Sequence, residues 1–255
     1  MTDPFKSARL KIARAKKHID DLHVLIERFK AEANNSYEIV IEDDPEPGYK
    51  VHKFRLLEAV PYDDLSIIMG DALNNIRAAL DHIVYACAIT NRHAIPPFKT
   101  CSFPFGKDAK SFTNAVNGCT AVHADIRACL SRFNAYDGGN TSLWTLNSMC
   151  NRDKHALITT ALTGFDDIWL DIRTGAVEMP GPTGWDNVKH EINLFRTKQD
   201  PDYEFHYSVE MTFNGPPYLT GNRIVPVFNH FVDMAECILM TIESETRRLF
   251  PSSFL

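Results

Sequence analysis

Arg77 and His82 stand five positions apart in a mostly apolar stretch of the sequence, and their types are those that phosphate chemistry needs. A histidine titrates near neutral pH and can act as a general base or acid. An arginine keeps its charge and grips phosphate oxygens with two donors. Attack of a neighbouring hydroxyl on a phosphate needs a base, an acid and a positive charge on the phosphate. Arg77 and His82 are therefore candidates for such a reaction.

A long helix is expected to position this pair. Residues 64–90, here called the central helix, repeat apolar side chains with a period close to 3.6. Each helical residue advances about 100° around the axis, so a five-residue step leaves Arg77 and His82 about 140° apart. The two side chains do not stack, but they can flank a phosphate that lies across the helix.

Asn74 and Asp81 fall on the same stripe of the central helix as Arg77. The four-residue step from Arg77 to Asp81 makes an ion pair easy. A central helix must satisfy such polar groups with partners. A non-catalytic alternative follows, in which Arg77 and Asp81 form a buried ion pair and Asn74 and His82 complete a hydrogen-bond network.

A second polar cluster ends the helix predicted over residues 141–153. Asn151, Arg152 and His155 stand at this end, with Asn147 one turn earlier. One interpretation is a helix C-terminus where cations meet free carbonyls. The other is that this end faces the central helix and supplies a second arginine and a second histidine to one shared site.

A divalent metal site in the helical bundle is a further alternative. Carboxylates and imidazoles of the two clusters could ligate an ion, namely Asp71, Asp81, His82, Asp153 and His155. Against it, the clusters hold no Glu-x-x-His or His-x-x-x-His pair, and Arg77 and Arg152 would place positive charge beside the metal. The sequence also lacks a phosphate-binding glycine loop, a dinucleotide fingerprint and zinc-ligand spacing, so we expect no cofactor.

Composition indicates an ordinary folded protein. Of 255 residues, 44% are hydrophobic and 24% charged, and the net charge of −6 argues against a generally basic nucleic-acid binder. A local basic face remains on the first predicted helix, residues 4–33, and it matters only if it borders a site. The six cysteines form no CxxC pair and are expected to be reduced. Without a secretory signal or an 18-residue apolar run, we expect a cytoplasmic protein with no membrane span.

The remaining pattern predicts an α+β fold in one domain. Residues 1–155 are expected to form mainly a helical bundle with a β-hairpin at 37–59. Residues 156–212 read as an antiparallel β-meander, with alternation beginning at Val188. A closing helix is expected over 227–249. The prediction is a bundle around the central helix plus an antiparallel sheet from the hairpin and the meander.

Arg77 followed after four residues by His82 on a helix resembles the signature of the HEPN superfamily. That resemblance implies a small helical bundle and a metal-independent endoribonuclease of a toxin–antitoxin or phage-defence system. It also implies RNA as a partner and a homodimer with the Arg–His pair at its interface. Ala78 stands where nuclease members often carry a polar residue.

The sequence also resembles, loosely, uncharacterised bacterial proteins that pair two short stretches. Here these are Leu80-Asp81-His82 and Asp153-Lys154-His155. That likeness implies one shared site and no particular activity.

Overall fold

The computed structural model describes residues 3–33, 36–92, 97, 100–153, 156, 158, 160–165, 169–179, 185–186, 188–207 and 209–254. Helices and antiparallel strands both occur in these ranges, which confirms the α+β class. The helices are α1 (Lys6–Ala33), α2 (Tyr62–Arg92), α3 (Ala109–Gly118), α4 (Ala124–Ser131), α5 (Thr141–Asp153), α6 (Ile224–Leu249) and the 3₁₀-helix η2 (Pro251–Phe254). The strands are β1 (Tyr37–Asp43), β2 (Lys50–Leu56), β3 (Thr160–Phe165), β4 (Trp169–Thr174), β5 (Glu191–Thr197), β6 (Asp202–His206) and β7 (Val209–Phe213).

Residue contacts divide the chain into two compact units. The helical unit contains residues 1–21, 67–158 and 225–255, and the strand unit contains residues 22–66 and 159–224. The expectation of a single domain stays a prediction, because compactness alone does not say whether a unit folds without the rest.

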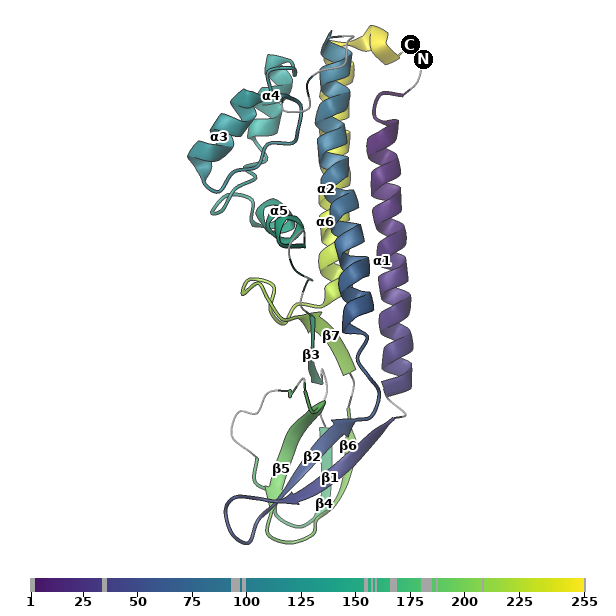
Figure 1. Ribbon diagram of the computed structural model, residues 1–255, viewed down its shortest axis with the longest axis vertical. Coiled ribbons are helices and arrows are strands. Elements are labelled where there is room, and N and C mark those ends of the chain that lie inside the picture. Colours follow the sequence, from purple (N-terminus) through teal and green to yellow (C-terminus); the bar gives the residue numbers. More distant parts are fainter. Residues whose placement is uncertain are drawn as a thin grey trace. The chain divides into compact units, whose positions relative to one another are not determined.

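In the helical unit, α1, α2 and α6 run side by side (Figure 1). Ion pairs join α1 to α6, and a contact of 3.3 Å between Cys87 Sγ and Thr246 Oγ1 joins α2 to α6. The apolar stripe of α2 is buried from Leu73 onward, as the 3.6-residue period predicts, while Ile67 near the start of the helix is 56% exposed. Its buried members include Leu73, Ile76 and Leu80. This core fixes the rotation of α2 and therefore the directions of its polar side chains.

Helix α5 lies against α2 in the same unit. The Sγ of Cys150 in α5 lies 3.4 Å from the backbone oxygen of Leu73 in α2. Asn140 caps α5, since its Oδ1 accepts the backbone N–H of Leu143 at 3.0 Å. The helix that follows this cap spans Thr141–Asp153, as the sequence predicts.

Helix α6 begins at Ile224, three residues before the predicted start at 227. Pro226 lies inside its first turn, where the missing N–H would have no intrahelical partner in any case. Among the described residues, α6 is the one helix long and apolar enough to cross a membrane by length and composition. Its inner face is nevertheless buried in the helical unit, with Phe228 and Ile242 at 0% exposure, and core helices pass the same test. Nothing in the structure gives positive evidence for a membrane.

The strand unit pairs its strands differently from a meander. β5 joins the β1–β2 hairpin in an antiparallel sheet ordered β1-β2-β5, while β3 pairs with β7 and β4 with β6. Strands that follow one another after residue 156 are therefore not neighbours in a sheet. The hairpin itself is confirmed, with Tyr37 opposite Leu56 and Asp43 opposite Lys50.

Aromatic side chains explain this pairing. Burial alternates along β6, which turns Tyr203 and Phe205 inward. Tyr203 lies 4.9 Å from Phe195 of β5, and Phe205 lies 5.7 Å from Phe54 of β2, measured between ring centroids. Strand β6 therefore packs its face on the sheet instead of extending the edge beside β5. Offset and tilted ring pairs of this kind stabilise more than their buried area alone.

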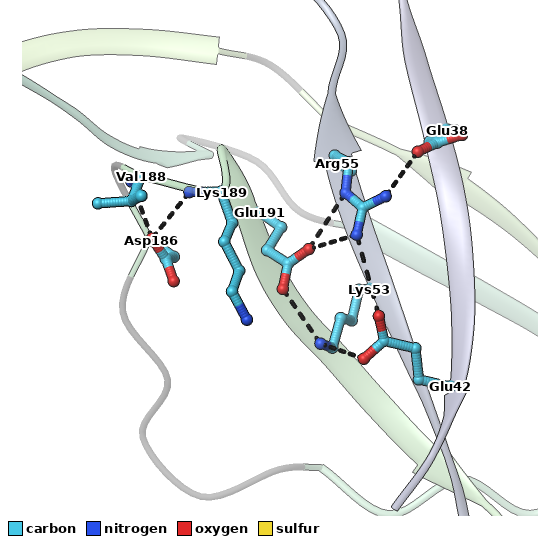
Figure 2. Close-up of polar contacts among 8 residues, drawn as sticks. All are labelled: Glu38, Glu42, Lys53, Arg55, Asp186, Val188, Lys189 and Glu191. Atoms are coloured by element: carbon cyan, nitrogen blue, oxygen red, sulfur yellow. Dashed lines mark hydrogen bonds and ion pairs between the residues drawn. The ribbon is translucent and has the colours of Figure 1, made fainter.

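The outer face of the three-stranded sheet carries a charged cluster (Figure 2). Lys53 Nζ lies 2.6 Å from Glu42 and 3.1 Å from Glu191, and Arg55 donates to Glu191 at 2.8 and 3.1 Å. Burial alone would raise the pKa of Glu191, but hydrogen bonds from Arg55 and Lys53 outweigh it and hold that pKa below its usual range. Glu38 completes the cluster through Arg55 at 3.0 Å. The cluster is satisfied by its own members.

Residues 188–190 form a turn, and the predicted alternation from Val188 is wrong there. Val188 is 91% exposed, and its N–H donates to Asp186 Oδ1 at 2.8 Å, as does that of Lys189 at 3.0 Å (Figure 2). Strand β5 starts only at Glu191. An aspartate that accepts backbone N–H groups two and three residues on stabilises a turn against a strand.

Candidate functional site

A pocket of about 490 Å³ lies in the helical unit beside the middle of α2. Helix α2 contributes the side chains that the sequence marked, Asp81 and His82, together with Tyr85 one turn later. Ser7 of α1 and the segment 100–106 close the other sides, the latter through Cys101 and Ser102. The pocket has the size of a small-molecule or nucleotide site.

His82 is half-buried in this pocket, and its Nδ1 is buried without a hydrogen-bond partner in the part of the chain that the structure describes. Burial lowers the pKa of His82, and the nearby charge of Lys11 lowers it further, while Asp81 acts in the opposite direction. The usual pKa of histidine is about 6.5, so the imidazole is mainly neutral at pH 7. A neutral imidazole that lines a pocket can accept a proton from a bound group.

Lys11 brings one cation of α1 to the site, a contact that the sequence left open. Its Nζ lies 3.4 Å from Asn75 Oδ1 of α2. Ser7 and Lys11 are one turn apart on α1, so both belong to the side that borders the pocket. Lys11, Ser7 and Tyr85 were not among the predicted site residues. The four-residue step from Ser7 to Lys11 was visible in the sequence, but nothing there said which helix it would face.

The side chain of Arg77 contacts different residues from that of His82. Its Nη1 donates to Asp81 Oδ1 at 3.0 Å and its Nε donates to Asn147 Oδ1 of α5 at 3.3 Å. The guanidinium carbon lies 4.1 Å from the centroid of the Phe105 ring. The predicted ion pair with Asp81 is present, and Arg77 uses its donors and its flat face on protein groups.

Asp81 lies between the Arg77 contacts and the His82 pocket. The same Oδ1 that binds Arg77 accepts the backbone N–H of Phe103 at 2.8 Å. Asp81 thereby ties the segment 100–106 to α2, while its carboxylate also lines the pocket. Arg77 and His82 thus flank Asp81, as the 140° step between them requires.

Asn147 and Asp153 of the second polar cluster contact α2. Besides Asn147, Asp153 of α5 accepts from Asn74 Nδ2 at 3.0 Å. A Cβ at Gly70 would stand 2.6 Å from an oxygen of Asp153, so this carboxylate packs on α2 at a place where residue 70 has no side chain. Asn151 and Arg152 are exposed. Lys154 and His155 lie outside the described residues, so the expected contribution of His155 stays a prediction.

Within the described residues, no three or more His, Cys, Asp or Glu side chains are grouped so that they could hold a metal ion. Asp71 is exposed, and Asp81 is bound to Arg77. His155 of the proposed ligand set falls outside those residues. What the structure brings together at α2 is a histidine, a lysine and a carboxylate.

A comparison of the chain with protein-family models, with curated proteins and with solved structures finds no match. The resemblance to the HEPN superfamily therefore stays a prediction that rests on Arg77 and His82.

Lys11→Met is expected to raise the pKa of His82. A cation near an imidazole disfavours the imidazolium, so removing it lets the ring bind a proton at higher pH. The shift can be measured by NMR titration of the ring C–H protons. Lys17→Met on an exposed part of α1 is the matched control and should leave that pKa unchanged. An unchanged or lowered pKa in Lys11→Met would contradict the placement of Lys11 beside His82.

Proposed function

We propose that the protein is a metal-independent endoribonuclease whose reaction takes place in the His82 pocket. The observation that carries the proposal is His82 itself: a half-buried imidazole, mainly neutral at pH 7, that lines a cavity. Such a combination of burial, perturbed pKa and a cavity is more frequent at functional sites than elsewhere.

The proposed reaction uses the residues in distinct roles. Neutral His82 takes the proton of the 2′-hydroxyl, which attacks the adjacent phosphorus. The 5′-oxygen leaves and is protonated by water, so the products are a 2′,3′-cyclic phosphate and a 5′-hydroxyl. Lys11 stabilises the negative charge that grows on the phosphate. Lys11 supplies a single positive charge to the phosphate, whereas the sequence had suggested two hydrogen bonds from Arg77.

Arg77 has a positioning role in this proposal. Its contacts with Asp81, Asn147 and Phe105 hold the carboxylate that tethers the segment 100–106, one wall of the pocket. The sequence had placed Arg77 on the scissile phosphate. To reach a phosphate, the guanidinium would have to give up these contacts.

The decisive experiment offers purified protein single-stranded and structured RNAs with and without EDTA. Cleavage is expected in both conditions, with cyclic phosphate at the new 3′ ends. Cleavage that stops on adding EDTA, or no cleavage of any RNA, overturns the proposal. The cytoplasmic location belongs to the proposal too, while the homodimer with Arg77 and His82 at its interface stays a prediction. All six cysteines lie outside disulfides, which suits a reducing compartment.

A second candidate function, a non-catalytic binding protein, is favoured by one observation. The Arg77 network already satisfies much of the polar band of α2, which is what a structural network requires. In that case the same residues hold the fold, and the pocket binds without cleaving.

The variant Arg77→Lys tests whether Arg77 positions the pocket wall or binds the scissile phosphate. We expect the free energy of unfolding to fall by about 1 kcal/mol, since the pair with Asp81 is partly exposed and a lysine keeps the charge but not the fork. Urea unfolding and RNA cleavage are measured on the same sample, with Arg14→Lys on an exposed part of α1 as control. A positioning role predicts that cleavage falls no more than several-fold. A loss of 100-fold or more in a stable protein would instead assign Arg77 to the phosphate, as the sequence suggested.

A further inference from the structure

A groove of about 540 Å³ lies between α1 and α6 in the helical unit. On the α1 side it is lined by Arg9, Ile12, Ala13 and Lys16, at helical steps of three, one and three. These residues face away from Ser7 and Lys11, because about 180° of helix rotation separates the two sets. The groove is therefore a different surface of α1 from the one that borders the His82 pocket.

The α6 side repeats the same spacing with the opposite charge. It is lined by Glu236, Leu239, Met240 and Glu243. On each helix, two apolar residues stand between two charged ones. The α1 charges are both positive and the α6 charges are both negative.

Two ion pairs bridge the groove at its ends. Arg9 lies 2.8 Å from Glu243, and Lys16 lies 2.7 Å from Glu236. This order shows that α1 and α6 are antiparallel. Glu243 also accepts from Arg247 at 2.7 Å, and Arg9 approaches Asp3 at 3.2 Å, so one further charge of each sign lies at that end.

The apolar centre of the groove is partly open to solvent. Met240 is 64% exposed and Ala13 is exposed, whereas Ile12 and Leu239 are buried, at 3% and 6% exposure. Methionine is enriched in the cores of protein–protein interfaces.

From this charge pattern we infer that the groove is the contact surface between two copies of this chain, related by a two-fold axis that runs parallel to α1 and α6. Such an axis places α1 of each copy over α6 of the other. Arg9 of each copy then faces Glu243 of the other copy, and Lys16 faces Glu236. A cation therefore faces a carboxylate at both ends of the groove. The apolar residues of both copies meet between them.

The competing two-fold axis, which runs across the helices, is disfavoured by the same charges. It would place α1 over α1, with Lys16 facing Arg9 of the other copy, and α6 over α6, with carboxylate facing carboxylate. Like charges set opposite one another oppose association. Two turns of two helices form a small contact, so we expect a dimer with a dissociation constant in the micromolar range.

Cysteine cross-linking tests the geometry in the full-length chain. In a Cys237→Ser background, which removes the one exposed native thiol, protein carrying Ala13→Cys is mixed with protein carrying Met240→Cys and oxidised. We expect disulfide-linked dimers that contain one chain of each kind. Predominant linking of Ala13→Cys protein to itself would assign the other axis. No cross-link, together with a monomer in sedimentation equilibrium at high micromolar concentration, would overturn the inference.

A charge swap tests the pairing between copies. The double variant Lys16→Glu, Glu236→Lys keeps the ion pair within each chain and should still form dimers with itself. Mixed dimers with the wild type would bring like charges together, so subunit exchange should yield at least tenfold fewer of them than exchange between differently tagged wild-type chains. Statistical mixing would contradict the proposed axis.

Met240→Glu keeps this inference separate from the proposed nuclease function. It should weaken the dimer at least tenfold and leave RNA cleavage unchanged, because Met240 lies outside the His82 pocket. A wild type that forms the dimer but cuts no RNA would reject the nuclease alone. A wild type that cuts RNA as a monomer under all conditions would reject the dimer alone.

Discussion

His82→Ala is expected to lower RNA cleavage about 10²–10⁴-fold, the usual effect of removing a general base. The fold should survive, because Nδ1 of His82 makes no hydrogen bond to the described residues and its loss leaves no partner unsatisfied. Single-turnover cleavage and the urea midpoint are measured together, so that a rate loss can be told from unfolding.

The pH profile gives an independent reading of the same group. Cleavage by neutral His82 should rise with pH and level off at a pKa below the usual 6.5 of histidine, because burial and Lys11 both lower that pKa. His23→Ala, an exposed histidine of α1, is the matched control and should keep the wild-type rate and profile. Wild-type cleavage by a folded His82→Ala protein would remove the histidine from the mechanism.

Gly106→Ala is expected to destabilise the protein by about 3 kcal/mol and to weaken ligand binding in the pocket. A Cβ at residue 106 would stand 2.3 Å from the backbone nitrogen of Phe112 and 2.6 Å from its Cα. These are backbone atoms at the start of α3, so the chain itself must shift, and overpacking of this kind costs about 1–3 kcal/mol or more. Gly106 ends the segment whose Cys101 and Ser102 wall the pocket.

Gly118→Ala is the control for this substitution. Gly118 ends α3, and apart from its chain neighbours and its own helix backbone no described atom lies within 4 Å of the place where a Cβ would be added. Its unfolding free energy should change by no more than a few tenths of a kcal/mol. Equal urea midpoints for the two alanine variants would show that the segment 100–106 tolerates displacement and does not hold the pocket wall.

The sequence was sufficient for the features of α2 that depend on helical spacing. The apolar stripe around Leu73 and Ile76 is buried, and Arg77 pairs with Asp81 because residues four apart face each other. The contact of Arg77 with Asn147 joins residues 70 positions apart in the chain. Helical spacing says that both side chains are polar and near helix middles, but which helices become neighbours depends on how the whole core packs.

The missed parts of the site are contacts of that long-range kind. Lys11 reaches α2 because α1 packs beside it, and the backbone N–H of Phe103 reaches Asp81 from an irregular segment without a periodic pattern. In the strand unit, the sequence predicted a β-meander in residues 156–212 but could not choose the partner of β6. Hydrogen-bonding edges are alike in every strand, so the choice of β4 over β5 was made by where Tyr203 and Phe205 pack.

The position of Cys101 in the pocket wall has a practical consequence. Its thiol is 2% exposed, and burial followed by the charge of Asp81 raises its pKa, so it reacts slowly with alkylating reagents while the wall is in place. Cys237 is exposed and supplies a fast reference reaction in the same chain. The ratio of the two alkylation rates therefore measures how often the segment 100–106 moves away from α2, with or without a ligand. The measurement needs no engineered residue.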